Sequence, residues 1–254
     1  MIASIGIIGS GNTAWQLAHH FVKSGVALKF IASRNQEAAL QLASSLCTES
    51  HHISEFPEVE GLILCVTDTA IEEVSISIKD KSKWQAHCCG SVSIESLAHE
   101  NKGVFYPLQT MTKGRFLEAK RIPVCVEANN AELESKLKAL AKDCGFNSLD
   151  LNSEMRAGTH ISAVMVNNFT NHVLAHAFKW AHENNIDKQV FRQLAIETID
   201  KAFDLGAEKS QTGPAKRKNE AIISKHLDQL ESMPESQELY NFLTNSIKKE
   251  FEQQ

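Results

Sequence analysis

The sequence predicts an α/β protein in which a doubly wound parallel sheet, over residues 1–152, is followed by an all-helical domain, over residues 153–254. Apolar strand-like runs alternate with amphipathic helical stretches through the first domain, which is typical of a parallel α/β sheet. A glycine-rich turn follows the first of these runs. After about Asn152 the strand-like runs stop, and helical periodicity continues to the end of the chain.

The glycine-rich turn, Gly9-Ser10-Gly11-Asn12-Thr13-Ala14, lies between the first predicted strand and the first predicted helix. Gly9 lets the chain leave the strand sharply, Gly11 leaves room for a pyrophosphate, and the small Ala14 lets the helix pack closely. The helix N-terminus offers unpaired N–H groups and the positive end of its dipole to that pyrophosphate. The turn therefore predicts a Rossmann-like dinucleotide site. The alternatives are an ordinary βα turn or the sulfonium-cofactor site of a methyltransferase.

The second strand, Val26 to Ile31, is followed by a hydroxyl and a cation, Ser33 and Arg34. An NAD site places Asp or Glu here to bind the ribose 2′-hydroxyl, whereas the 2′-phosphate of NADP needs a hydroxyl and a guanidinium. No acidic residue occurs between Met1 and Gln36. The sequence therefore predicts NADP(H) as the cofactor. The alternative is that Arg34 is a surface residue that opens the next helix.

The rest of the first domain continues the alternation. Strands are expected at 61–66, 83–87, 103–106, 122–126 and 147–151, and helices at 36–45, 71–78 and 130–144. Because the carboxyl ends of parallel strands face the ligand crevice, residues that follow two of these strands are expected to line the cofactor. They are Val66, Thr67 and Asp68 and, on the nicotinamide side, Gly90 and Ser91. Asp68 has the alternative role of a helix N-cap.

The helical domain begins with a long apolar stretch, residues 154–185, which is predicted to form one helix. A helix that is apolar nearly all round is normally buried on several sides, and in so small a domain this predicts a homodimer. At ~100° per residue, Asn171 lies close to the direction of His160, and Asn168 lies within a quadrant of it. His160 is the candidate general acid–base residue, and Asn168 and Asn171 are candidates to orient a carbonyl or imine. A hydrogen-bonded set inside a helix interface is the alternative.

Further helices are expected at 189–203, 214–230 and 237–251. The helix expected at 214 has Thr212 as its cap and a proline in its first turn. Its free N–H groups and nearby cations would suit an anionic substrate, so Thr212, Gly213 and Arg217 are the candidate substrate contacts. An ordinary capped surface helix is the alternative.

The composition and net charge limit the classes of partner and the cellular location expected for this protein. The 254 residues are 43% hydrophobic and 22% charged, with a net charge of −5, which gives no general attraction to nucleic acid or to an anionic membrane. No run approaches the ~18 apolar residues of a membrane-spanning helix, and the first strand begins so near Met1 that no signal peptide is expected. We therefore expect a cytoplasmic protein. The six cysteines lack zinc or C-x-x-C spacing, so no metal site is predicted, and the histidine pairs at 19–20 and 51–52 are expected at the surface.

The order of these motifs resembles that of one bacterial family, whose members combine a Rossmann-like NADP oxidoreductase domain with a helical domain of unknown function, of type 2520. The matching segments are Gly9–Ala14, Ser33-Arg34, His87-x-x-Gly90-Ser91, Phe105–Thr110, Arg156-x-x-x-His160, Asn168-Phe169-x-Asn171-His172 and Gln211–Arg217. The family is distantly similar to pyrroline-5-carboxylate reductase, ketopantoate reductase and F420-dependent NADP reductases. The resemblance implies a 6-phosphogluconate-dehydrogenase-like helical domain, a dimer, and an active site between the two domains.

Two departures from these relatives bear on catalysis. The family usually reads His-Thr-Ser-Gly where this chain has His87-Cys88-Cys89-Gly90, so a hydroxyl is missing near the expected nicotinamide. The ketopantoate and β-hydroxyacid relatives use a Lys with an Asn four residues later, where this chain offers His160 and Val164. Their catalytic pair therefore does not transfer to this chain.

Two functions follow as hypotheses. The leading one is an NADP(H)-dependent oxidoreductase that transfers hydride to or from a C=O or C=N bond of a small, anionic metabolite. The other is a non-catalytic NADP(H)-binding protein, either a redox sensor or a partner-binding module. The missing hydroxyl and the absent Lys–Asn pair favour the second hypothesis.

Overall fold

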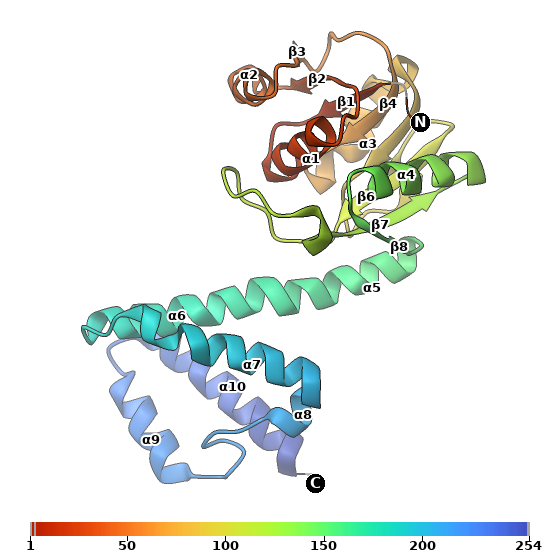
Figure 1. Cartoon of the computed structure of the whole chain (residues 1–254). Helices are drawn as coiled ribbons and strands as arrows, with labels where there is room; N and C mark the ends of the chain where they lie inside the picture. Colours follow the sequence, from red (N-terminus) through yellow and green to blue (C-terminus); the bar gives the residue numbers. More distant parts are fainter. Residues whose placement is uncertain (1, 3, 253–254) are drawn as a thin grey trace. The chain divides into compact units, whose positions relative to one another are not determined.

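The computed structural model describes Ile2 and residues 4–252, and the chain divides into two compact units, Met1–Asn168 and Phe169–Gln254 (Figure 1). The boundary expected from the sequence, between residues 152 and 153, marks the end of the last strand. The boundary in the structure follows the packing of the chain, and it leaves one further helix with the sheet. The two boundaries rest on different criteria, and the roles expected for the two domains stay predictions.

The first unit is built on an eight-stranded sheet with the order β3-β2-β1-β4-β5-β6-β7-β8. Its strands are β1 (Ile5–Ile8), β2 (Leu28–Ser33), β3 (Glu49–His52), β4 (Val59–Leu64), β5 (Ser82–His87), β6 (Lys102–Pro107), β7 (Pro123–Ala128) and β8 (Asn147–Asp150). Neighbouring strands pair in parallel except β6 and β7, which are antiparallel. The strand order reverses at β1, and doubly wound sheets bind ligands at such a switch point. The predicted fold class is confirmed.

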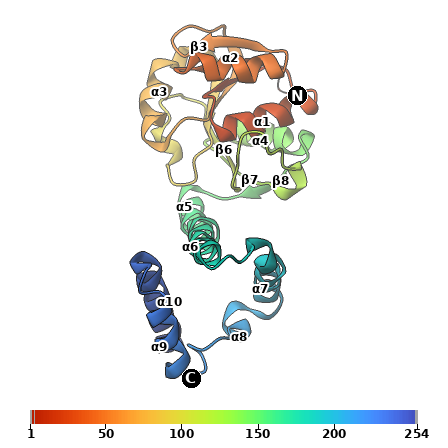
Figure 2. The ribbon, with the colours of Figure 1, turned by 90° about the vertical axis from the view of Figure 1, so that its left-hand side faces the viewer.

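Helices cover both faces of the sheet. Four of them belong to this arrangement: α1 (Asn12–Lys23), α2 (Gln36–Ser45), α3 (Ile71–Ser77) and α4 (Ala131–Asp143). Ile5 and Ile7 of β1 pack with α1, α2 and α4, whereas Ile8 packs with α3 on the opposite face. Successive side chains of a strand point to opposite faces, so β1 contributes to both cores. Figure 2 shows α3 on one side of the sheet and α1 with α4 on the other.

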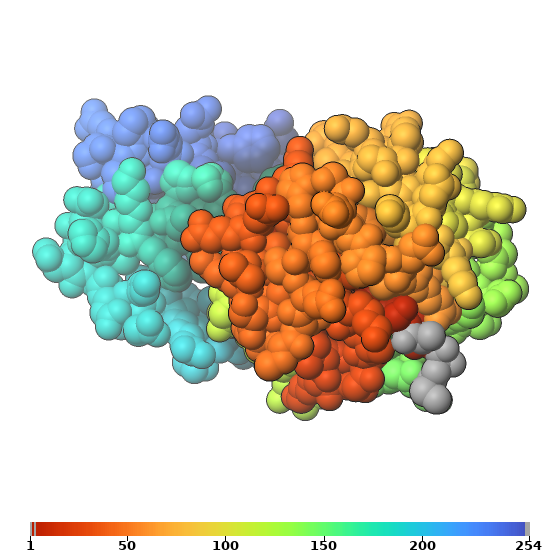
Figure 3. All heavy atoms as spheres, turned by 90° about the horizontal axis from the view of Figure 1, so that it is seen from above, coloured from red at the N-terminus to blue at the C-terminus, as the bar shows by residue number. Residues whose placement is uncertain are grey.

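The edge strand β3 is absent from the sequence-based prediction. Its residues are polar, two of them exposed and two half-buried, and it lies at the edge of the sheet beside β2, so it carries no apolar signal. The orange surface formed by α2 and β3 faces the viewer in Figure 3. The expectation that both histidine pairs lie at the surface is wrong for His20, which is 2% exposed. Its Nε2 lies 3.0 Å from the carbonyl oxygen of Leu117, so α1 holds the loop that follows β6.

The long helix expected at 154–185 is interrupted. It consists of α5 (Ser153–Ala163), a π-helix at Val164–Phe169 and α6 (Thr170–Glu183). A π-helix has a wider turn than an α-helix and is frequently found at functional sites. Because it changes the rotation per residue, the α-helical projection that aligned Asn171 with His160 does not apply across it.

The second unit contains α6, a short 3₁₀ turn at Lys188–Phe191, α7 (Arg192–Leu205), α8 (Ala207–Ser210), α9 (Glu220–Gln229) and α10 (Pro234–Glu252). The helix start predicted at Pro214 is wrong. Residues 213–218 form turns instead, and α9 begins at Glu220, where the side chain of Asn219 accepts from the N–H of Ile222. Among the residues that the structure describes, no helix combines the length and apolarity needed to cross a membrane.

Candidate functional site

The turn between β1 and α1 has the geometry of a phosphate-binding turn. Gly9 is buried with φ +115°, and a side chain on it would collide with the carbonyl oxygen of Cys65. Gly11 is the N-cap of α1 without a side-chain cap, and a Cβ on it would meet nothing within 4 Å. Ala14 is fully buried against the sheet. An uncapped helix N-terminus that faces open space fits an anionic group such as the pyrophosphate of a dinucleotide.

The end of β2 lies directly beside this turn. The hydroxyl of Ser10 donates to the hydroxyl of Ser33 over 3.1 Å, and the N–H of Asn35 donates to the same Ser33 oxygen over 3.2 Å. Arg34 follows with an exposed side chain. The structure therefore brings the two predicted halves of the NADP site together, and the exposed guanidinium fits a 2′-phosphate.

The other two polar residues of the turn, Asn12 and Thr13, lie at the start of α1. The Asn12 side-chain oxygen accepts from the N–H of Lys113 over 3.3 Å, so it helps to hold the loop after β6. Thr13 is half-buried at the start of α1.

The loops after β4 and β5 meet through Asp68 and Ser91. The Ser91 hydroxyl donates to the Asp68 carboxylate over 2.7 Å, and the thiol of Cys89 lies 3.3 Å from the same hydroxyl. Thr67, not Asp68, is the N-cap of the 3₁₀ turn that follows β4, so the alternative role of Asp68 as an N-cap is wrong. Of the other residues expected to line the cofactor, Val66 is half-buried and Thr67 is exposed.

The Asp68 carboxylate is stabilised by these contacts. Burial works to raise its pKa, but hydrogen bonds from Cys89 and Ser91 and the electrostatic interaction with His160 outweigh burial, so the pKa lies below its ordinary value. This carboxylate is therefore an anion at neutral pH, and it is electrostatically linked to the predicted acid–base residue.

His160 forms a pair with a residue that the sequence analysis did not select. Its Nδ1 lies 3.2 Å from the hydroxyl oxygen of Tyr106, which stands near the end of β6. Gly90 packs against both rings, since a Cβ on it would lie 2.6 Å from His160 Nδ1 and 2.7 Å from Tyr106 Cζ. Burial raises the pKa of Tyr106 to about 12, so its hydroxyl stays protonated. The sequence signals for Tyr106 are its place at a strand end beside a proline and its position in the Phe105–Thr110 segment, and neither assigns it a role.

A cavity of about 410 Å³ opens beside this pair. It is lined by Tyr106, Leu108, Gln109, Thr110, Thr159, His160, Ser162, Ala163, Val164, Val166, Asn167 and Asn168. The lining combines amides and hydroxyls with short aliphatic side chains, and it contains neither Lys nor Arg among the described residues. Asn168, which lies in the π-helix, and His160 thus line one cavity, and the orienting role of Asn168 stays a prediction.

The remaining predicted site residues lie in the second unit. Asn171 is on α6 with an exposed side chain, while Thr212 and Arg217 are exposed on the turn before α9. Gly213 begins that turn with φ +103°. Because the turn does not open a helix, the predicted anion site at a helix N-terminus lacks its helix.

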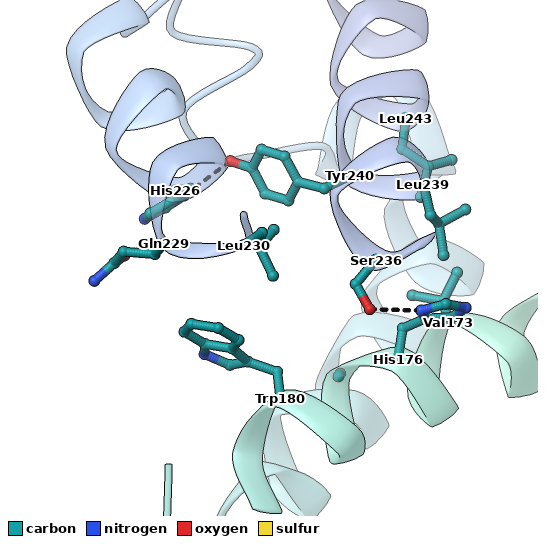
Figure 4. A pocket seen from close by; sticks show the side chains of 11 residues that line it. Val173, His176, Trp180, His226, Gln229, Leu230, Ser236, Leu239, Tyr240 and Leu243 are labelled. Atoms are coloured by element: carbon teal, nitrogen blue, oxygen red, sulfur yellow. Dashed lines mark hydrogen bonds between the residues drawn. The ribbon is translucent and has the colours of Figure 1, made fainter. Parts of the chain in front are cut away.

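The second unit has its own cavity of about 380 Å³ (Figure 4). Its wall is largely apolar, with Trp180, Leu230 and Leu243 among the lining residues, and none of the predicted site residues lines it. Two polar pairs lie at its side: His176 Nδ1 is 2.8 Å from the Ser236 hydroxyl oxygen, and His226 Nδ1 is 2.8 Å from the Tyr240 hydroxyl oxygen.

A sheet with a phosphate-binding turn at its switch point and polar residues at the neighbouring strand ends is typical of a dinucleotide-binding protein. Comparisons with known proteins agree. Residues 4–89 match the family described as NADP oxidoreductase, coenzyme F420-dependent, and residues 122–247 match a domain of unknown function, DUF2520. A protein of Bacteroides fragilis, provisionally named an NADP oxidoreductase, is 33% identical over 98% of both chains, with a TM-score of 0.92. The chain therefore belongs to the NADP oxidoreductase family in which these two domains are joined.

More distant solved structures share the fold. Protein TM1727 of Thermotoga maritima is 18% identical over 98% of both chains, with a TM-score of 0.71. A 1-pyrroline-5-carboxylate reductase of Streptococcus pyogenes is 15% identical over 97% of this chain and 98% of its own, with a TM-score of 0.59. A search of curated proteins finds no sequence match. The DUF2520 match begins at residue 122, next to β7, so this family domain includes the last two strands of the sheet.

Proposed function

We propose that this protein is an NADPH-dependent reductase of a C=O or C=N bond in a small metabolite. One observation carries the proposal: the Tyr106–His160 pair stands beside Gly90 at the strand ends next to the dinucleotide turn, and a cavity large enough for a small metabolite opens beside it. Membership of an NADP oxidoreductase family supports the cofactor.

The binding roles follow from the fit of the residues. The uncapped N-terminus of α1 would hold the pyrophosphate, and Ser33 with Arg34 would hold the 2′-phosphate. Since the adenosine half lies on the β2 side of such a turn, the nicotinamide half extends across β1 toward the ends of β4 and β5. There the loops that contain Asp68 and Ser91 are joined by a hydrogen bond, which gives the nicotinamide side a defined wall.

The catalytic roles divide between cofactor and protein. NADPH, when bound, supplies the hydride. His160 donates the proton to the oxygen or nitrogen of the reduced bond, and in the reverse direction it accepts that proton. Tyr106 bonds Nδ1 and so orients the ring with Nε2 available for the substrate. Asn168 can orient the carbonyl or imine from the cavity wall.

The residues that line the cavity beside His160 also bear on the charge of the substrate. The cavity beside His160 has no Lys or Arg among its described lining residues, so an anionic group on the substrate would need a cation from elsewhere in the chain. Arg217, Thr212, Gly213 and Asn171 belong to the second unit, and the substrate contacts expected of them stay predictions.

We also propose that the second unit is completed by a second copy of the chain. Large apolar side chains are exposed on it, including Phe203 at 82%, Phe242 at 68% and Leu194 at 66%. Its buried apolar residues are few among the residues that the structure describes: Ala181, Ala215, Ile223 and Met233. In Figure 2, α7 and α8 lie on one side of this unit and α9 with α10 on the other. So much exposed apolar surface is unfavourable in water and marks an interface.

A redox sensor is the second candidate function. The thiols of Cys65 and Cys88, at the ends of the paired strands β4 and β5, lie 3.6 Å apart. One hydrogen peroxide would oxidise the two thiols to a disulfide and yield two water molecules. Burial raises the pKa of Cys88 well above its ordinary value, which keeps this thiol protonated and slows its oxidation. The reductase is therefore the better-supported function.

The test of the reductase is NADPH oxidation by the purified protein with a panel of ketones, keto acids and cyclic imines. A compound that is reduced by the wild-type protein and not by His160→Ala supports the proposal. Peroxide-dependent disulfide formation at Cys65 and Cys88, without any NADPH oxidation, favours the sensor.

A further inference from the structure

A buried arginine holds the loop that follows β5. Arg156, on the first turns of α5, is 0% exposed, and its guanidinium makes five hydrogen bonds. Three of them, at 3.0, 3.1 and 2.7 Å, go to the carbonyl oxygens of Cys89, Gly90 and Val92. A guanidinium that collects three carbonyls of one short loop fixes the orientation of the peptide groups in that loop.

The charge of Arg156 is balanced from another strand. Its Nη2 donates to the Glu127 carboxylate of β7 over 2.9 Å and to the Ser153 hydroxyl over 3.0 Å. Glu127 also accepts from the N–H and the hydroxyl of Ser153 at the start of α5. A buried charge without a partner is costly, and loss of one partner of a buried pair typically costs several kcal/mol. The ion pair therefore fixes the guanidinium in place.

The same turn of α5 holds the far end of the loop. The Ser153 hydroxyl oxygen accepts from the N–H of Ile94 over 3.2 Å. Contacts from α5 thus extend from Cys89 to Ile94, and the loop has little freedom to change its backbone.

The peptide groups then have a defined direction. A trans peptide points its N–H opposite to its C=O. Because the carbonyls of Cys89 and Gly90 point to Arg156, the N–H groups of Gly90 and Ser91 point away from it. The hydroxyl of Ser91 is in turn fixed on Asp68, and Gly90 packs against His160 and Tyr106.

We infer that Arg156, together with Glu127, is a positioning residue for the nicotinamide half of the cofactor: it holds the Cys89–Val92 loop so that Gly90 and Ser91 form the wall against which the ring lies, beside His160. This inference rests on the NADP site proposed above. Arg156 acts through the loop and touches neither the cofactor nor the substrate.

A second effect of Arg156 agrees with this role. Burial and the charge of Arg156 together lower the pKa of His87, at the end of β5, to about 4. A neutral His87 accepts the N–H of Cys89 through Nδ1 over 3.1 Å. The loop is thus held at its first residue by a neutral histidine and along its length by a charged arginine.

The experiment compares two ligands of different length on the full-length protein. NADPH contains the nicotinamide, and 2′-phospho-ADP-ribose contains everything except that ring. We expect Arg156→Lys to weaken NADPH binding about tenfold or more, because a lysine cannot reach three carbonyls and a carboxylate at once. We expect 2′-phospho-ADP-ribose to bind within about twofold of the wild-type affinity. The fluorescence change of the bound reduced nicotinamide should be lost in parallel.

Two further variants keep the test decisive. Glu127→Gln leaves Arg156 in place and removes its counter-charge, so it should show the same selective loss at smaller size if Arg156→Lys does not fold. Arg115→Lys, at an exposed arginine of the same unit, should change neither affinity. Folding of each variant is checked by thermal unfolding.

The outcomes separate the two proposals. Equal weakening of both ligands would show a general structural role and overturn the inference, and so would unchanged binding of both ligands in folded Arg156→Lys and Glu127→Gln. If the wild-type protein binds neither ligand, the NADP site itself is wrong. If it binds both but reduces no carbonyl or imine, the proposed reaction fails while the positioning role is still measured.

Discussion

The hydroxyl oxygen of Tyr106 lies 3.2 Å from Nδ1 of His160, although 54 residues separate the two in the sequence. Tyr106 stands near the end of β6, and His160 lies on α5. Gly90, in the loop after β5, packs against both rings. Three segments of the chain therefore meet at one point, on the side of the sheet where the reactive half of a dinucleotide is expected.

Substitutions at the two glycines of the turn after β1 should have different effects, one on stability and the other on NADPH affinity. Gly9→Ala places a Cβ against the Cys65 carbonyl at φ +115°, so the free energy of unfolding should fall by about 2 kcal/mol or more. Gly11→Ala meets no atom within 4 Å, so it should fold normally but lose NADPH affinity by about tenfold or more, because the methyl group occupies the pyrophosphate space. Chemical denaturation and NADPH titration distinguish the two. Normal NADPH binding by Gly11→Ala would contradict the pyrophosphate position.

Arg34 should decide between the two nicotinamide cofactors. Arg34→Ala should weaken NADPH binding about 10- to 100-fold and leave NADH binding within about twofold, because only NADPH carries the 2′-phosphate. Lys29→Ala, at an exposed lysine of β2, is the matched control and should change neither. Calorimetric titration measures both ligands. Equal losses for NADPH and NADH would remove Arg34 from the 2′-phosphate site.

His87 should make the protein less stable in mild acid. The pKa of His87 is about 4 in the folded protein and 6.5 ordinarily, because burial and the charge of Arg156 disfavour the imidazolium. Between these values the unfolded chain binds more protons than the folded one, so the free energy of unfolding falls as pH drops from 6.5 toward 4. The full contribution is roughly 3 kcal/mol.

The His87→Asn variant isolates this contribution. Its side-chain oxygen can still accept the Cys89 N–H but does not titrate. Its stability should therefore fall less steeply than that of the wild type over the same pH range, as measured by denaturant unfolding. Parallel pH dependences would show that His87 does not titrate as its burial implies.

The apolar surface of the second unit should carry the dimer. Phe203→Asp puts a charge on the most exposed of these side chains and should convert the dimer to monomer in light scattering. Leu40→Asp, at an exposed leucine of α2 that is 57% accessible, is the control and should leave the oligomeric state unchanged. A wild-type monomer that keeps its helical content on dilution would overturn the dimer proposal.

Much of the first unit could be predicted from the sequence because its signals are local. The glycine turn places the start of α1, and the helix expected at 36–45 coincides with α2. The polar strand β3 could not be predicted, since its place depends on pairing with β2 and not on apolar burial.

The residues of the candidate site that lie in recognisable local motifs could be predicted from the sequence. The contacts between distant segments could not. Ser10 and Ser33 were selected separately, and the parallel pairing of β1 with β2 brings their hydroxyls to 3.1 Å. Tyr106 could not be selected, because its partner His160 belongs to a distant helix. The π-helix at Val164–Phe169 could not be predicted from apolar periodicity, and it changes the rotation between His160 and Asn171, so the role of Asn171 stays a prediction.

The most direct test of the account follows NADPH oxidation by wild-type protein and by His160→Ala across the panel of ketones, keto acids and cyclic imines. We expect the wild type to oxidise NADPH with at least one of these classes. His160→Ala should bind NADPH with unchanged affinity and turn over roughly 10²–10⁴-fold more slowly. Turnover unchanged in His160→Ala would contradict the acid–base role of His160. A wild-type protein that binds NADPH and oxidises it with none of the panel would contradict the reductase itself.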